Sequence, residues 1–290
     1  MKWFSAFLLL ISVIGAYLYT HWGPGLLDQV DRISQGSATV KAASAVQFGR
    51  HGQSLDIWRG RGNMAPAPVI VFYYGGGWVK GSREEYGFAA RAYASKGFVV
   101  VVTDYRKVPQ AYFPAFVQDA ADAVRWTRDN ITKYGGDPER IAIAGHSAGA
   151  HSVAMLALDP QWLAAVGAPG AVKAAVGLSG PYDFYPFTGR AVAAMGKWRD
   201  PAETQPINFA RKEAPPMMLI TGTADTTVRP KNARNLFAAL SRSGAVVVEK
   251  EYPGLGHEDI AMALSLPFRT KATVLDDSSS FLMAHLKKAQ

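Results

Sequence analysis

Short apolar segments alternate with helical segments along most of this chain after residue 40, and this alternation restricts the folds that it can adopt. Several of the segments are apolar at every position, which is typical of central strands covered on both faces of a sheet. Strands that alternate with helices favour a mostly parallel sheet with helices on both sides. The pattern predicts strands near 69–74, 98–103, 141–145, 174–178, 217–221 and 246–252, helices near 114–134, 230–243 and 274–288, and an opening antiparallel hairpin from 45–48 and 54–58.

The composition supports a single large domain after a short N-terminal piece. Hydrophobic residues make up 49% of the 290 residues and charged residues 19%, which excludes a disordered chain. No repeat is visible at the spacing of a solenoid, and no Pro-, Gly- or Ser-rich linker divides the alternating region. We therefore predict one catalytic domain over residues 37–290.

Cysteine content and charge exclude several kinds of site. The chain has no cysteine, which rules out a thiolate nucleophile, disulfides and cysteine-based metal sites. No group of His, Asp and Glu shows the spacing of metal ligands either, so we predict no metal. The formal net charge is +8, but the 31 Lys and Arg are scattered instead of forming a basic stripe. We therefore predict no nucleic-acid partner.

The N-terminal segment is distinct from the rest of the chain. Residues 3–27 contain no Asp, Glu, Lys or Arg, and aromatic residues flank the apolar run at both ends. This pattern favours an uncleaved membrane anchor at 3–22, with a tether to about residue 36, over a cleaved signal peptide. The anchor places the catalytic domain outside the cytoplasm, in the periplasm or beyond the cell. The alternative is secretion after signal cleavage.

The motif Gly145-His146-Ser147-Ala148-Gly149 is the strongest local signal of chemistry. It follows the apolar strand at 141–144 and precedes a helical run at 150–158. A tight turn from strand to helix needs small residues on both sides of its central residue, and it leaves that residue exposed near the start of the helix. Ser147 is therefore the candidate nucleophile.

A second glycine-rich motif, Tyr74-Gly75-Gly76-Gly77-Trp78, also ends an apolar strand. Such a loop can turn backbone N–H groups inward, as the binding of an oxyanion requires. One alternative is a plain flexible turn. Another is a phosphate-binding loop, but no Lys-Ser/Thr pair follows at the required spacing.

A serine nucleophile needs a base and an acid that orients the base. Among the six histidines, His257 lies in a glycine-rich loop after the last strand, where sites of open α/β sheets gather. The acid is Asp225, which follows the strand at 217–221, and the alternative acid is Asp183, which follows the strand before it. The other five histidines are less suitable. His21 lies in the apolar segment, and His51 precedes the sheet. His146 and His151 lie on either side of the serine, and His285 lies in the last helix.

The order Ser147, Asp225, His257, each just past a strand, resembles the α/β-hydrolase fold. The loop at 74–78 is similar to the His-Gly-Gly-Gly oxyanion loop of hormone-sensitive-lipase-like and BD-FAE-like carboxylesterases. The resemblance covers about residues 45–288 and includes the connecting motifs Thr103-Asp104-Tyr105-Arg106 and Tyr134-Gly135-Gly136-Asp137-Pro138. One departure is that Tyr74 stands where the family has histidine.

The resemblance implies a serine esterase with a Ser-His-Asp triad and no cofactor, acting on a small-molecule ester. It also implies an oxyanion hole from the backbone N–H groups of Gly76, Gly77 and Ala148. The aromatic-rich stretch 181–216 is predicted to be a lid that supplies an apolar pocket. An arylformamidase or peptidase using the same triad remains an alternative, as does a non-catalytic binding protein. The sequence leaves the oligomeric state open.

Overall fold

The computed structural model describes residues 23–35, 38–62 and 66–287. Its strands are β1 (Thr39–Phe48), β2 (Gln53–Gly60), β3 (Ala67–Tyr73), β4 (Val99–Thr103), β5 (Gly136–His146), β6 (Val172–Leu178), β7 (Met217–Gly222) and β8 (Val247–Tyr252). Its α-helices are α2 (Pro24–Gln35), α3 (Gly87–Ser95), α4 (Ala115–Asn130), α5 (Ala148–Leu158), α6 (Gln161–Ala165), α7 (Arg190–Met195), α8 (Lys231–Ser243), α9 (His257–Met262) and α10 (Val274–His285). Short 3₁₀ helices are η1 (Glu84–Tyr86), η2 (Ile131–Tyr134), η3 (Pro201–Thr204), η4 (Pro206–Phe209) and η5 (Leu266–Lys271).

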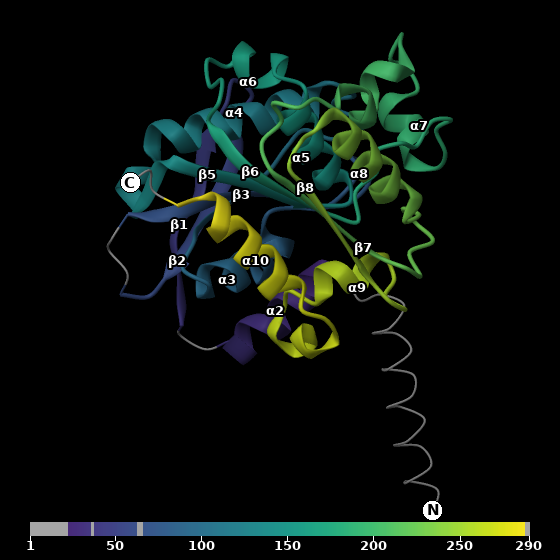
Figure 1. The fold of residues 1–290 in the computed structure, drawn as a ribbon. Helices are drawn as coiled ribbons and strands as arrows, with labels where there is room; N and C mark the ends of the chain where they lie inside the picture. Colours follow the sequence, from purple (N-terminus) through teal and green to yellow (C-terminus); the bar gives the residue numbers. More distant parts are fainter. Residues whose placement is uncertain (1–22, 36–37, 63–65, 288–290) are drawn as a thin grey trace, which may run out of the picture.

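The strands form one 8-stranded sheet in the order β1-β2-β4-β3-β5-β6-β7-β8. β2 pairs antiparallel with β1 and β4, and every other pair is parallel. Helices α3 and α10, together with α2, cover one face, and α4, α5 and α8 cover the other (Figure 1). The predicted α/β-hydrolase architecture, with its antiparallel beginning, is therefore confirmed. Because the central strands are parallel, their carboxyl ends meet at one edge of the sheet, where ligands of open α/β sheets bind.

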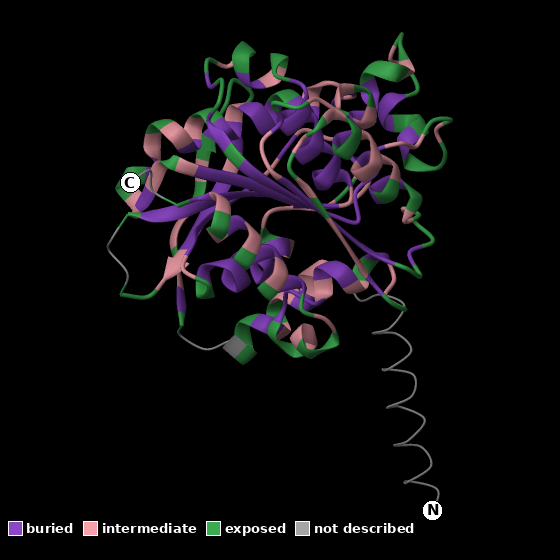
Figure 2. Ribbon diagram, viewed as in Figure 1, coloured by how far each residue is buried: buried purple, intermediate pink, exposed green. Residues whose placement is uncertain are grey.

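The core lies on both faces of the central strands. Every residue of β3 and of β4 is buried, and Figure 2 shows the middle of the sheet enclosed between the two helical layers. This burial explains why these strands are continuously apolar instead of alternating. Burying one Val or Ile side chain contributes about 1.5–3 kcal/mol to the stability of the fold. The central strands therefore hold the loops that follow them in place.

The N-terminal tether predicted up to residue 36 is wrong for residues 24–35. They form helix α2, which packs against the domain with Leu27 only 3% exposed. The Arg91 side chain donates to the carboxylates of Asp28 (2.7 Å) and Asp31 (2.8 Å), and Asp31 also accepts from the Leu266 N–H (2.7 Å). These partners are distant in the sequence, so the spacing of residues near the N-terminus could not reveal them.

The predicted anchor, residues 3–22, lies outside the described residues. Within the part of the chain that the structure describes, none of the helices combines the length and apolarity needed to cross a bilayer.

Candidate active site

Ser147 occupies a sharp turn between β5 and α5. Its φ of 55° and ψ of −119° lie outside the regions that L-residues commonly adopt. The Ser147 N–H donates to the Leu178 carbonyl at the end of β6 (2.8 Å), and the Ser147 carbonyl accepts from the His151 N–H in α5 (3.1 Å). Neighbouring strand and helix thus hold the residue from both sides, which maintains the strained geometry of a nucleophile elbow.

Gly145 and Gly149 are required in this turn because neighbouring backbone atoms leave no room for a side chain. A β-carbon at Gly149 would lie 2.1 Å from the Tyr73 carbonyl oxygen, and one at Gly145 would lie 2.7 Å from the Gly149 carbonyl carbon. Both obstacles are backbone atoms, so no side chain can move aside to relieve the clash. The spacing of small residues around Ser147 therefore reflects tight packing of α5 against β3.

The structure brings Ser147, His257 and Asp225 together. His257 begins α9 after β8, and Asp225 follows β7. The His257 Nδ1 atom lies 2.8 Å from Asp225 Oδ2, and its Nε2 atom lies 2.9 Å from Ser147 Oγ. Because a carboxylate only accepts, the imidazole proton is on Nδ1, which leaves Nε2 free to accept the serine proton. The geometry is that of a nucleophile, a general base and an orienting acid.

The Asp225 carboxylate is fixed by more than His257. It is only 3% exposed. Its Oδ1 atom accepts from the backbone N–H groups of Thr227 (2.9 Å) and Val228 (2.7 Å), while Oδ2 faces the imidazole. Three hydrogen bonds therefore satisfy this buried carboxylate and set its orientation.

The alternative acid, Asp183, faces a different partner. Its Oδ2 atom accepts from the Asn235 side chain on α8 (2.6 Å), and its backbone N–H donates to Asn232 (2.9 Å). It thus joins the end of β6 to α8 instead of contacting His257. The sequence favoured Asp225 and kept Asp183 as the alternative, and the hydrogen bonds place Asp225 against His257 and Asp183 against Asn235.

Gly76 and Gly77 lie at the pocket beside Ser147, and Ala148 is the first residue of α5. Gly76 has a φ of +134° and Gly77 one of +63°, and a β-carbon at Gly76 would lie 2.1 Å from the Lys80 carbonyl oxygen. The Gly76 carbonyl accepts from the Val79 N–H (3.3 Å) and Lys80 N–H (3.2 Å), which turns the loop back on itself. This conformation is accessible to glycine and to few other residues.

Tyr74 directly precedes this loop and stands where the esterases that the sequence resembles have a histidine. Its side chain is held by several contacts. Its hydroxyl donates to Asp104 (3.2 Å) and accepts from the Lys107 ammonium (2.8 Å), and its ring stacks on Tyr105 at 4.5 Å. The Tyr105 hydroxyl in turn donates to the Tyr74 carbonyl (3.0 Å). A fully buried phenol with two polar partners thus supports the glycines that follow it.

His146 contacts His257, and the sequence pattern did not reveal this contact. Its Nε2–H donates to the His257 carbonyl (3.2 Å), so its Nδ1 atom accepts from the Tyr86 hydroxyl (2.9 Å). The two imidazole centroids lie 4.9 Å apart. The motif at 145–149 placed His146 beside the serine, but only the fold shows that it reaches the loop that carries the base.

Burial keeps His146 and the neighbouring His151 uncharged. Burial and the nearby His257 lower the pKa of His146 to about 3, and burial lowers the pKa of His151 to about 4. The ordinary value is 6.5, so both side chains gain a proton in the unfolded chain at a higher pH than in the folded one. Stability from this source is complete above pH 6.5 and decreases as the pH falls toward the folded values.

We therefore expect the melting temperature to fall between about pH 6.5 and pH 4.5, with about 2–3 kcal/mol lost per histidine. His151→Gln should show a flatter dependence, because its side chain takes up no proton in this range. Differential scanning calorimetry on the two proteins measures the effect. Equal slopes for wild type and variant would contradict it.

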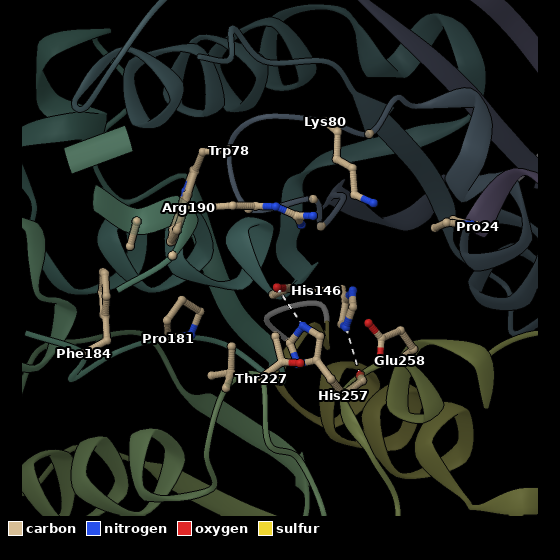
Figure 3. A pocket seen from close by; sticks show the side chains of 18 of the residues that line it. Pro24, Trp78, Lys80, His146, Pro181, Phe184, Arg190, Thr227, His257 and Glu258 are labelled. Atoms are coloured by element: carbon tan, nitrogen blue, oxygen red, sulfur yellow. Dashed lines mark hydrogen bonds between the residues drawn. The ribbon is translucent and has the colours of Figure 1, made fainter. Parts of the chain in front are cut away.

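The site opens into a pocket of about 710 Å³ that Ser147 and His257 share. Apolar side chains including Trp78 and Phe184 line one part of it, and their rings stack at 6.1 Å. Lys80 and Arg190 extend into it from one side, opposite Glu258 (Figure 3). The described residues hold no group of three or more His, Asp or Glu suited to a metal ion.

The predicted lid, 181–216, contributes to this pocket. Its residues at the wall are Pro181, Phe184, Thr188, Gly189, Arg190 and Ala191. The segment is joined to the domain by the His151 Nε2–H, which donates to the Thr204 carbonyl (2.8 Å), and by the Arg211 side chain, which donates to the Leu158 carbonyl (2.8 Å). Of the aromatic residues of this segment, Phe184 lines the pocket. That the segment acts as a lid stays a prediction.

The parallel sheet, the strained serine turn and the histidine that joins serine to aspartate define an α/β-hydrolase with a serine-hydrolase type of site. The sequence model of the BD-FAE family matches residues 55–240, and the chain belongs to this family.

The chain is similar to curated esterases and to solved esterase structures. It is 37% identical to esterase LipC and 33% identical to esterase LipQ, both from Mycobacterium tuberculosis, over 71% and 81% of this chain. It covers 56% and 61% of the length of those relatives. The structure of an esterase from Pyrobaculum calidifontis matches with a TM-score of 0.71 and 26% identity, over 90% of this chain and 92% of that one.

Proposed function

We propose that this protein is a serine hydrolase that cleaves carboxylic esters through an acyl-enzyme. The observation that carries the proposal is the continuous hydrogen-bonded path from Ser147 Oγ through His257 to Asp225, at 2.9 Å and 2.8 Å. The esterase relatives support the same reaction class. A non-catalytic binding protein would have no need of this arrangement at the bottom of a pocket.

In the proposed reaction, Ser147 Oγ attacks the ester carbonyl while His257 Nε2 takes the hydroxyl proton. The tetrahedral intermediate then expels the alcohol, which receives that proton from His257. A water molecule next attacks the acyl-enzyme with His257 again as base, which releases the carboxylic acid and restores the serine. Asp225 stays ionised and stabilises the imidazolium.

The oxyanion of each tetrahedral intermediate is proposed to bind the backbone N–H groups of Gly76, Gly77 and Ala148. Among the described residues, no backbone carbonyl accepts from the N–H of Gly76 or of Gly77, which leaves both donors for a ligand. Donors that are already in place act most strongly on charge that develops in the transition state.

Hydrolysis assays across p-nitrophenyl esters of graded chain length, with N-formylkynurenine and a dipeptide amide, test the proposed substrate class. We expect turnover of the esters and little or none of the amides. A fluorophosphonate probe followed by peptide mass spectrometry should place the covalent label on Ser147. Faster turnover of N-formylkynurenine or of the dipeptide would favour the arylformamidase or peptidase alternative, and a label elsewhere would contradict the proposed nucleophile.

We further propose that residues 3–22 anchor the enzyme in a membrane and place the catalytic domain outside the cytoplasm. The uncharged, aromatic-flanked segment supports this. After cell fractionation, we expect the intact chain in the membrane fraction, released by detergent and not by alkaline carbonate. Protease added to spheroplasts should degrade the domain. A soluble mature protein that begins near Tyr17 would contradict the anchor and leave export intact.

A further inference from the structure

Helix α2 begins at the mouth of the pocket that contains Ser147. Gly23 and Pro24 line this pocket together with Ser147 and His257, and Figure 3 shows Pro24 at its edge. The Gly23 carbonyl accepts from the N–H groups of Leu26 (3.1 Å) and Leu27 (3.4 Å), so Gly23 caps the first turn of the helix. Gly23 thereby both caps α2 and lines the pocket.

The position of this helix start is fixed relative to the active site. The Arg91 side chain, 3% exposed, donates to both Asp28 and Asp31, and Asp31 is fully buried. Asp31 also accepts from Leu266 at the start of η5, which follows α9, the helix that carries His257. Breaking a buried ion pair by removing one partner costs about 3–5 kcal/mol, so α2 separates from the domain only at a large cost.

The predicted anchor directly precedes Gly23, the residue that caps α2 beside the pocket. The anchor predicted at 3–22 ends at Trp22, and Gly23 is the next residue; the uncharged stretch itself continues to Leu27. One residue spans at most about 3.6 Å, so no spacer separates the anchor from the pocket mouth. With the anchor in a bilayer, the mouth therefore lies at the membrane interface.

We infer that the pocket faces the membrane surface and that the substrate is an ester of an amphiphile dissolved in the bilayer. This inference rests on the proposed function and on the proposed anchor. Moving a lipid chain fully into water costs about 0.8 kcal/mol per CH₂ group, and a pocket at the interface avoids most of that cost. The apolar side chains Trp78 and Phe184 suit an acyl chain that enters from this side.

The charges in the pocket suit a zwitterionic bilayer. Lys80, Arg190, Glu85 and Glu258 all line it, so two basic side chains are balanced by two acidic ones. A strongly anionic surface would attract one pair and repel the other. Phosphatidylcholine vesicles are therefore the appropriate probe.

The experiment separates the anchor from the pocket by a flexible spacer. The full chain is reconstituted in phosphatidylcholine vesicles, and a Gly/Ser spacer of about 20 residues, about 25 Å in mean span, is inserted between Trp22 and Gly23. The matched control carries the same spacer after Gly36, on the C-terminal side of α2. In this control the predicted anchor is still joined directly to Gly23. Each protein is assayed on an oleate ester embedded in the vesicles and on water-soluble p-nitrophenyl butyrate.

We expect the spacer before Gly23 to lower hydrolysis of the embedded ester at least five-fold. The control insertion should leave that rate unchanged, and all three proteins should hydrolyse p-nitrophenyl butyrate equally. Equal rates on the embedded ester for all three would overturn the inference, as would a parent chain that does not stay with the vesicles. A parent chain inactive on p-nitrophenyl butyrate would instead overturn the proposed function, which the soluble substrate tests alone.

Discussion

Replacement of Ser147 by alanine is expected to lower turnover of ester substrates by about 10⁴- to 10⁶-fold. The hydroxyl oxygen is the only atom of this residue that can form the acyl-enzyme, and it lies 2.9 Å from the base. What remains is hydrolysis by water in a site that still holds the proposed oxyanion hole and the pocket. The measurement is kcat on p-nitrophenyl butyrate, with the melting temperature as a check on folding.

Ser179→Ala provides a matched control for this experiment. Ser179 follows β6, is buried, has a φ of 49° and has no side-chain hydrogen-bond partner among the described residues. It therefore reproduces the loss of one serine hydroxyl at a positive-φ position near the same sheet edge, without the contact to His257. We expect it to keep turnover within about two-fold. A Ser147→Ala protein that keeps most of its turnover would show that the nucleophile is elsewhere.

The fold and the three central side chains were predictable because they depend on local patterns. Continuous apolar runs identify covered strands, and Gly145 and Gly149 mark a close backbone approach that the sequence shows directly. His257 and Asp225 were accessible for a related reason, since the ends of parallel strands meet at one edge. The sequence favoured Asp225 over Asp183, and the contact of Asp225 with His257 comes from the fold.

Other features depend on contacts between residues far apart in the sequence. Helix α2 is held by Arg91, 60 positions from Asp31, and His146 reaches the carbonyl of a residue 111 positions away. No periodicity or local motif encodes such pairs, because each side chain is ordinary in its own neighbourhood. This is why residues 24–35 were predicted as a tether, and why a histidine beside the nucleophile was set aside.

Asp225→Asn is expected to lower turnover by about 10⁴-fold while the fold survives. An asparagine amide can present its NH₂ group to His257 Nδ1, which then becomes an acceptor and moves the imidazole proton to Nε2. A protonated Nε2 cannot accept the serine proton. Because the side chain keeps its shape, the bonds from Thr227 and Val228 to Oδ1 can persist, and the effect should appear in kcat more than in KM.

Asp183→Asn is the comparison that makes this prediction specific to one carboxylate. Its partner is the Asn235 amide on α8, and an amide oxygen at position 183 can still accept that bond. We expect turnover within about ten-fold of wild type, with any loss arising from the pocket wall and not from the tautomer of His257. The two variants are to be measured together, over a range of pH and with melting temperatures. If Asp183→Asn were the slower enzyme at equal stability, Asp183 would be the acid, and the contact between Asp225 and His257 would be structural.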